Sequence, residues 1–427
     1  MHHRLRSIGA QIKKSPFSKN IPKTLFDLIN KISPQLDASS VITSSGKIDT
    51  NSGIESVDII TGTASGISNG SEGMISSRFQ EHSWVTDDGA IHILANTNEQ
   101  LTLYTAKAGT NEPNFEIAAI LDNSNKSSRS DGLILGNTLY LTYSTDNGGL
   151  AFSTLSYNDE TTSWTAESSH FSDPFPSTKF QRPSIAVSED GTIYVAFTST
   201  KNTTDKTRLR AAYSKDGGSS WILDDRSINN TSNNGRMSGD IMTTDNGVGL
   251  LYTNGASLNW VEVSTKTTDR NNPLTEQVLL TQGKRQKDPK GTHFSSLTDT
   301  DGNIHVATNN GKQRVIYLRY DNVSADWEEP VEITDYKSGS YMQISILEND
   351  SLLLSHDARR DGEKYLEVAG STDGGKNWSK QARLEQQISA NPGNPRVEAP
   401  SYAQESLPIF QQVESNLGNN SLVYFEV

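Results

Sequence analysis

Short apolar strands alternate with tight polar turns along most of this chain, and the alternation recurs as a repeat. The clearest copies are SIAVSEDGTIYVAF, from Ser184, and SSLTDTDGNIHVAT, from Ser295. In both, alternating side chains flank an Asp-Gly pair, the dipeptide that readily adopts the positive φ of a β-hairpin turn. Seven copies place their turns at Asp88, Gly136, Asp190, Asn246, Asp301, Asn349 and Glu405.

The spacing of these turns predicts the fold. Successive turns are 48, 54, 56, 55, 48 and 56 residues apart, which suits one four-stranded sheet per repeat. The sequence therefore predicts an all-β fold, a seven-bladed β-propeller of four-stranded antiparallel blades. A six-bladed ring with an accessory tail is the alternative count.

The two ends of the repeat region predict how the ring closes. The tail supplies strand-like SYAQ, LPIFQQV and SLVYFEV, and SVDIITGT near Ser56 supplies a fourth strand. We therefore expect residues 56–427 to form a propeller closed by pairing of its N- and C-terminal strands. Residues 1–55 are expected to form a basic arm, a short helix over residues 24–33 and a linker.

Composition excludes several classes of protein. Only 33% of the residues are hydrophobic and no apolar run approaches 18 residues, so no transmembrane segment is expected. Without cysteine there are no disulfides or thiolate metal sites. The first residues lack the apolar core of a secretory signal, which leaves the compartment open. No cofactor is predicted; Asp-rich turns can hold structural calcium, although EF-hand spacing is absent.

Charge is unevenly distributed along the chain. The net charge is −13, which argues against nucleic acid as a partner, because binding its backbone requires a basic surface. Residues 1–40 nevertheless carry seven Lys or Arg and two Asp, a net charge of about +5. This arm is a candidate docking element for a protein partner, and its simplest alternative is a solubilising tail.

A second motif carries a family resemblance. Ser214-Lys-Asp216-Gly-Gly-Ser-Ser-Trp221 and Ser371-Thr-Asp373-Gly-Gly-Lys-Asn-Trp378 share the pattern S-x-D-x-G-x-x-W, and looser copies end at Trp164 and Trp327. The chain resembles the sialidase-like (bacterial neuraminidase repeat) β-propellers, in which such Asp boxes recur once per blade. The resemblance covers about residues 78–427 and implies the fold. Asp boxes lie away from the ligand, so they imply little about function.

Residues that enter the innermost strands are the candidates for a ligand site. Each begins at the rim of the central funnel, on the face opposite the Asp boxes, so their side chains are expected to converge. They are His82, Arg129, Arg182, Arg236, His293, Tyr341 and Arg396. Arginine pairs bidentately with carboxylate or sulfate, and a positive funnel in an acidic protein attracts anions. The alternative is that these side chains pair with acidic residues of adjacent blades.

The resemblance carries part of a sialidase site onto this chain. Phe180-Gln-Arg182-Pro183 is similar to the family's arginine motif, and Asp205 follows at a distance like that of its acid/base aspartate. Tyr341 resembles the setting of the tyrosine nucleophile, with Arg314 as a further arginine. However, the family's glutamate–arginine pair is missing around residues 240–254, and the order of these elements differs. The sequence therefore argues against a true sialidase.

Two classes of function remain. Some propellers of this type are polysaccharide lyases, whose β-elimination needs a cation at the uronate carboxylate and a His or Tyr base. The catalytic candidates are Tyr341, His293, His82 and Asp205, and the ligand-binding candidates are Arg129, Arg182, Arg236, Arg314 and Arg396. We expect recognition of an anionic carbohydrate (uronate, sulfated or sialylated), and leave open whether a lyase or glycosidase activity follows. The alternative is a non-catalytic scaffold for protein assembly, docked through the basic arm.

Overall fold

The computed structural model describes most of the repeat region. The described residues are 58–70, 73–75, 79–109, 113–169, 179–200, 208–224, 238–244, 247–254, 257–264, 276–281, 293–310, 313–336, 338–360, 363–385, 396–414 and 420–427. They form strands and turns without a helix, so the predicted all-β class is confirmed. Within them, no helix is long and apolar enough to cross a membrane. The basic arm and the predicted helix at 24–33 lie outside the described residues.

The strands build seven four-stranded antiparallel units, I to VII, each running from an innermost to an outermost strand. The innermost strands of I to VII are β3 (Ser83–Val85), β7 (Ser130–Leu135), β11 (Lys179–Val187), β15 (Ser238–Thr244), β19 (Phe294–Thr298), β24 (Ser338–Leu347) and β28 (Arg396–Glu398). The second strands are β4 (Ile91–Thr97), β8 (Thr138–Ser144), β12 (Ile193–Thr200), β16 (Gly247–Asn254), β20 (Ile304–Asn309), β25 (Leu352–Arg360) and β30 (Pro408–Glu414).

The outer half of each unit completes the sheet. The third strands are β5 (Gln100–Ala106), β9 (Leu150–Asn158), β13 (Arg208–Ser214), β17 (Ser257–Ser264), β21 (Val315–Asp321), β26 (Glu363–Ser371) and β31 (Asn420–Glu426). The outermost strands are β6 (Glu116–Ile120), β10 (Ser163–Ser169), β14 (Ile222–Asp224), β18 (Glu276–Thr281), β22 (Asp326–Trp327), β27 (Ser379–Glu385) and β2 (Thr63–Ala64). Short additions are β23 (Val331–Glu332) on β21, β29 (Tyr402–Ala403) on β24 and β1 (Asp58–Thr61) on β27.

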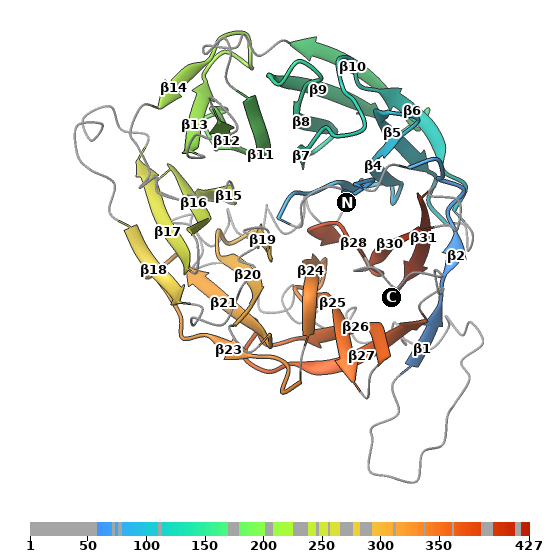
Figure 1. Cartoon of the computed structure of the whole chain (residues 1–427), viewed down its shortest axis with the longest axis vertical. Helices are drawn as coiled ribbons and strands as arrows, with labels where there is room; N and C mark the ends of the chain where they lie inside the picture. The colour runs from blue at the N-terminus through green and yellow to red at the C-terminus, as the bar shows by residue number, and fades with distance from the viewer. Residues whose placement is uncertain are drawn as a thin grey trace, which may run out of the picture. The chain divides into compact units, whose positions relative to one another are not determined.

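The units are arranged as a propeller, with innermost strands such as β7, β15 and β24 around the middle and β10, β18 and β27 at the periphery (Figure 1). Gly70 bridges both Thr97 of unit I and Asn420 of unit VII. This bridge makes units VII and I one continuous sheet, so the propeller has six hydrogen-bonded sheets. By that count it is six-bladed, the alternative that the sequence offered, although seven four-stranded units are present.

The first two strands of the described chain pair with the last two units. Asp58–Thr61 run parallel to β27 of unit VI, and Thr63–Ala64 pair with β31 of unit VII. Gly62 lies between them against the side chains of Val423 and Phe425, where a Cβ atom would approach within 2.5 Å. The predicted SYAQ strand lies elsewhere than expected: its Tyr402 and Ala403 pair with β24, and residues 396–398 form the innermost strand of unit VII.

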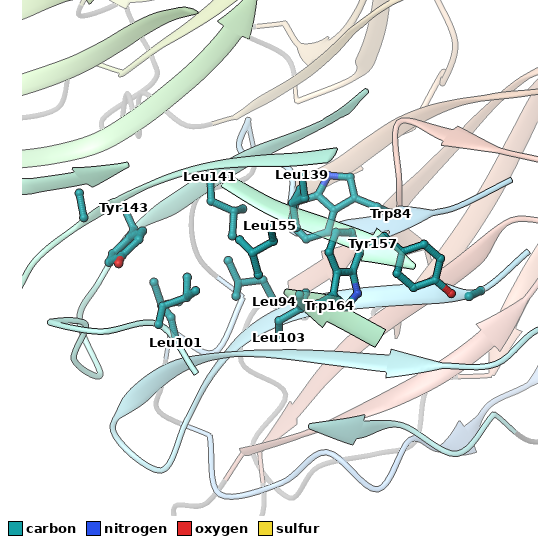
Figure 2. Packing of buried hydrophobic residues seen from close by; sticks show 13 residues of the cluster. Trp84, Leu94, Leu101, Leu103, Leu139, Leu141, Tyr143, Leu155, Tyr157 and Trp164 are labelled. Atoms are coloured by element: carbon teal, nitrogen blue, oxygen red, sulfur yellow. The ribbon is translucent and has the colours of Figure 1, made fainter. Parts of the chain in front are cut away.

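Apolar side chains fill the space between neighbouring units. Between units I and II, Trp84, Leu94 and Leu103 pack against Leu141 and Leu155 (Figure 2). Burial of this kind contributes about 1.5–3 kcal/mol per large side chain. The stacking of neighbouring units, more than any single unit, therefore holds the propeller together.

The four tryptophans of the repeat also join units. Trp164 of unit II donates its indole N–H to Nδ1 of His92 in unit I, at 3.2 Å. The other three contact an aromatic ring of the preceding unit, with centroids 5.3–5.4 Å apart: Trp221 on Phe152, Trp327 on Trp260 and Trp378 on Tyr317. Each tryptophan thus packs on the preceding unit as well as on its own hairpin.

Candidate functional site

The antiparallel topology defines two faces of the propeller. On the entry face lie the starts of the innermost strands and the loops between second and third strands. On the turn face lie the hairpins between first and second strands, together with the two S-x-D-x-G-x-x-W turns. The predicted ligand residues that the structure describes lie toward the entry face.

Hydrogen bonds through side chains join the innermost strands into a closed ring about the axis. The Asp131 carboxylate of unit II accepts the backbone N–H of Glu81 (2.7 Å) and of Ile185 (2.8 Å), which belong to units I and III. Asp240 of unit IV accepts the hydroxyls of Ser184 and Ser296, both at 2.5 Å, from units III and V. Two carboxyls thereby link five consecutive units.

The ring closes through units V, VI and VII. Ser295 donates its hydroxyl to Oε1 of Gln343 at 2.8 Å, and the Gln343 amide donates to Oε2 of Glu398 at 3.5 Å. Glu398 in turn contacts Nδ1 of His82 at 3.0 Å and accepts the backbone N–H of the same residue at 3.1 Å. These side chains of the innermost strands thus satisfy one another's hydrogen bonds between units.

Residues Phe79–Glu81, here called the axial segment, cross the middle of this ring. The Phe79 ring stacks on Phe294 of unit V, with centroids 5.3 Å apart. Gln80 donates its side-chain amide to the carbonyl of Pro183 in unit III, and Glu81 accepts the backbone N–H of Ser401 beside unit VII. Because these partners lie on different sides of the ring, the axial segment fills the axis at the entry face.

Three carboxyl groups in this region have raised pKa values. Loss of hydration raises the pKa of Glu81 to about 8, with a further contribution from the charge of Glu398. Burial raises the pKa of Asp240 to about 6, and burial with the nearby charge of Asp240 raises the pKa of Asp131 well above its usual range. Several acids around one low-dielectric axis cannot all ionise cheaply.

Two of the predicted arginines flank a short segment that precedes the axial segment. A terminal nitrogen of Arg129 lies 2.9 Å from where a Cβ atom on Gly73 would stand, and Arg396 donates to the carbonyl of Ile75 at 2.8 Å. Both side chains are half-buried. Since two residues span at most about 7 Å, the structure brings these two guanidinium groups to the same part of the entry face.

The predicted histidines and tyrosine are more buried than Arg129 and Arg396. His82 is buried at 1% exposure and engaged with Glu398, while His293 and Tyr341 retain 9% and 7% exposure. The Tyr341 backbone N–H donates to the carboxylate of Asp357 at 3.0 Å. The Ser295–Gln343 bond and the Ile344 N–H bond to Ser295 fix β19 against β24, and His293 and Tyr341 each lie two residues before this contact.

The remaining candidates are spread over the entry face. Arg182 is half-buried at a bulge in β11 and has a φ of 52°. Arg314 pairs with Glu332 at the start of β21. Asp205 and Arg236 lie outside the described residues. In the described part, no group of three or more His, Asp or Glu residues is arranged to hold a metal ion.

Sequence reasoning missed the axial segment and the carboxyls of the ring. A signal for the ring exists: Asp131, Asp240 and Glu398 are acids five to seven residues before their turns, within the predicted innermost strands. An acid at such a position needs a hydrogen-bond partner, which the neighbouring unit provides. The axial segment belongs to no copy of the repeat and carries no comparable signal.

The two S-x-D-x-G-x-x-W turns share one set of hydrogen bonds. In the first, Asp216 accepts the Ser214 hydroxyl and the backbone N–H of Ser220, and the Trp221 indole donates to the Gly218 carbonyl. The second turn, residues 371–378, repeats these bonds. Accepted hydrogen bonds lower the pKa of Asp216 and of Asp373 to about 2. These turns are closed local structures that stiffen the turn face.

Comparisons with known proteins support the fold and little beyond it. No protein-family model and no curated protein matches the chain. A solved polysaccharide lyase of family PL25, an ulvan lyase bound to -[GlcA(1-4)Rha3S]-, is 11% identical, covers 84% of this chain and 95% of its own, and has a TM-score of 0.52. A fungal alcohol oxidase of the AA5 family, in complex with copper, is 11% identical, with coverages of 81% and 73% and a TM-score of 0.51.

More distant matches include proteins that bind or process sugars. The Trypanosoma rangeli sialidase is 12% identical, covers 77% of this chain and 59% of its own, and has a TM-score of 0.43. At these identities the comparisons show a shared β-propeller fold, on which both glycan-acting enzymes and an oxidase are built.

Proposed function

We propose that this propeller recognises an acidic glycan on its entry face, beside the axis, through Arg129 and Arg396. The observation that carries the proposal is the placement of both guanidinium groups against the segment Gly73–Ile75. Side chains that are held in place before binding lose less conformational entropy when the ligand arrives. The arrangement therefore suits a rigid anionic group better than a mobile neutral one.

Charge and fold favour a uronate or sulfated polymer as the ligand. Guanidinium groups match the planar geometry of carboxylates and bind sulfates through paired hydrogen bonds. The ulvan lyase that shares the fold is bound to a glycan of glucuronate and sulfated rhamnose. Since the axial segment fills the axis, we expect an extended chain to lie across the entry face rather than to insert its end into a central funnel.

Cleavage by β-elimination is the finer part of the proposal, and it assigns His293 and Tyr341 as the acid–base pair. The two residues start neighbouring innermost strands whose register is fixed by Ser295 and Gln343. Elimination needs a base for the proton beside the uronate carboxylate and a cation that stabilises the resulting charge. His or Tyr and an arginine are the residue types that supply these roles.

Binding of purified full-length protein to polyuronate and sulfated polysaccharides, with neutral dextran as reference, tests recognition. The variant Arg129→Ala/Arg396→Ala should lose at least about tenfold in affinity, since each charged hydrogen bond contributes about 1.5–3 kcal/mol. A matched control is Lys215→Ala/Lys376→Ala, which removes two exposed cations from the turn face and should leave affinity unchanged. Equal affinity of the arginine variant and wild type would refute the proposal.

Elimination is tested on the same samples. An unsaturated uronate product absorbs in the ultraviolet, so a rising absorbance with acidic polymers would support lyase chemistry. Tyr341→Phe and His293→Ala should then abolish the rise while retaining binding. Binding without any rise would leave recognition standing and remove the catalytic assignment.

A protein-binding scaffold is the second candidate function, and the filled axis favours it. A ring whose innermost strands satisfy one another and whose axis is occupied offers a stiff platform in place of a pocket. The basic residues 1–40 would dock such a platform on an acidic partner. Absence of glycan binding, together with loss of a co-purifying partner on deletion of residues 1–40, would support this function over glycan recognition.

A further inference from the structure

The axial segment is built unlike the rest of the core. It ends one residue before β3 and lies outside the strands of the units. Gln80 contacts Pro183 of unit III and Glu81 contacts Ser401 beside unit VII. The Phe79 ring stacks on Phe294 as part of the hydrophobic cluster between units IV and V. Phe79 and Gln80 are buried at 4% and 1% exposure, although neither is part of a strand. The segment is therefore held by side-chain contacts and a few hydrogen bonds, without a ladder of backbone pairing along its length.

Glu81, the last residue of the axial segment, carries an ionisable carboxyl group. The acidic groups that act on its carboxyl come from three other units: Glu398 of unit VII, Asp240 of unit IV and Asp131 of unit II. His82, the adjacent residue, is engaged with Glu398. Glu81 is half-buried, and negative charge on it would thus meet negative neighbours on several sides.

We propose that the axial segment is a proton-controlled plug, which closes the axis while Glu81 is protonated and leaves it when Glu81 ionises. Opening exposes Phe79 and Gln80 and uncovers the carboxyls of the ring. Occupancy of the axis thereby becomes dependent on pH. Because the pKa of Glu81 is about 8 in the closed state and 4.5 in its ordinary state, opening is expected to increase over the pH range between these two values.

Hydrogen–deuterium exchange of the full-length protein tests this plug. The readout is protection of the backbone amides in peptides that cover residues 79–82, at pH 5 to 9, corrected for the intrinsic pH dependence of exchange. If opening releases one proton, the open population rises about tenfold per pH unit between the carboxyl's pKa in the open state and in the closed state. Protection should fall accordingly in the wild type.

Two variants identify the responsible group. Glu81→Gln keeps an acceptor for the Ser401 N–H but cannot ionise, so protection of residues 79–82 should stay constant with pH. Glu189→Gln, at an exposed hairpin turn, is the matched control and should follow the wild type. Should Glu81→Gln fail to fold, Asp240→Asn serves instead, and it should weaken the pH dependence by removing one of the opposing charges.

The outcomes separate clearly. Loss of protection that is specific to residues 79–82, dependent on pH and absent in Glu81→Gln supports the plug. Constant protection in the wild type, or the same pH dependence in Glu81→Gln, overturns it. Loss of protection throughout the innermost strands would show global unfolding instead, and would also overturn the proposal.

Discussion

The same chemical group behaves in opposite ways at the axis and at the turn face. Asp216 and Asp373 lie in exposed turns where they accept hydrogen bonds from their own loops, and their pKa values fall to about 2. Asp240 is buried and Glu81 is half-buried, each among other acids, and their pKa values rise to about 6 for Asp240 and about 8 for Glu81. The difference shows that hydration and neighbouring charge, rather than residue type, decide which carboxyls carry charge.

The contrast also distinguishes two ways of joining units. At the turn face, three of the four tryptophans pack on an aromatic ring of the preceding unit, and these contacts involve no carboxyl group. At the axis, carboxyls and amides bridge units through hydrogen bonds. We therefore expect the contacts between units at the axis to depend on pH. The tryptophan contacts at the turn face should not depend on pH above the pKa of Asp216 and Asp373.

The largest expected effect is on stability as pH rises. The pKa of the Glu81 carboxyl is raised on folding, from 4.5 to about 8. Such a group stabilises the folded protein at pH values below 4.5, and this contribution is lost as the pH rises from 4.5 to about 8. The free energy of unfolding should fall over this range by on the order of 5 kcal/mol. Urea unfolding measured at several pH values provides the test, and Glu81→Gln should flatten the curve. An equally steep curve in that variant would assign the effect to other groups.

Phe79→Ala should have the next largest effect, about 3 kcal/mol, because it removes a buried ring that stacks on Phe294. Chemical unfolding at pH 6, where the axial segment is expected to be in place, gives the value. Val323→Ala, at a side chain with 94% exposure, is the control for an apolar truncation without a packing partner. A cost below about 1 kcal/mol for Phe79→Ala would mean that the axial segment contributes little to the folded state.

Trp378→Ala should cost less, about 2 kcal/mol, because this half-buried indole loses its contact with Tyr317 and its hydrogen bond to the Gly375 carbonyl. The cost should be the same at pH 6 and pH 8, in contrast to that of Phe79→Ala, which should shrink as the axial segment leaves. Thermal unfolding of both variants at the two pH values compares the regions directly. If the loss of stability caused by Trp378→Ala also depended on pH, the contacts at the turn face and at the axis would not differ in the way proposed.

The smallest effect concerns a single hydroxyl that joins units II and I. Tyr157 donates to the carboxylate of Asp88 at 2.8 Å. Tyr157→Phe keeps the packing and removes this bond, so it should cost about 1 kcal/mol. Differential scanning calorimetry can resolve the shift, and Tyr140→Phe at a partly exposed position of β8 is the comparison. A cost above about 3 kcal/mol would show that the turn face also depends on charged partners.

The fold was predictable because its signals are local and repeated. Turns such as Asp190-Gly191 and Asp301-Gly302 mark hairpins within a few residues, and their spacing sets the size of each unit. The number of sheets was harder to predict from the sequence, because it depends on bridges that Gly70 makes to residues far away in the chain. Strand pairing of this kind is set by tertiary packing rather than by a local pattern.

The candidate site was predictable in part. The entry positions of the innermost strands do bring Arg129 and Arg396 to one segment, as repeat geometry suggested. The axial segment could not be foreseen, because its contacts span 103 residues from Gln80 to Pro183 and 320 residues from Glu81 to Ser401. Nothing near Phe79 in the sequence indicates that it reaches the opposite side of the ring.

The measurement that tests the account most directly is the titration of Glu81 itself. Carbon-13 spectra of protein labelled at the glutamate side-chain carboxyl, recorded from pH 4 to 10, assign this signal by its absence in Glu81→Gln. We predict that Glu81 titrates with a midpoint well above 4.5 and no higher than about 8, because opening on ionisation lowers the midpoint below that of the closed state. A Glu81 signal that titrates near pH 4.5, as in an exposed side chain, would contradict both the raised pKa at the axis and the plug that depends on it.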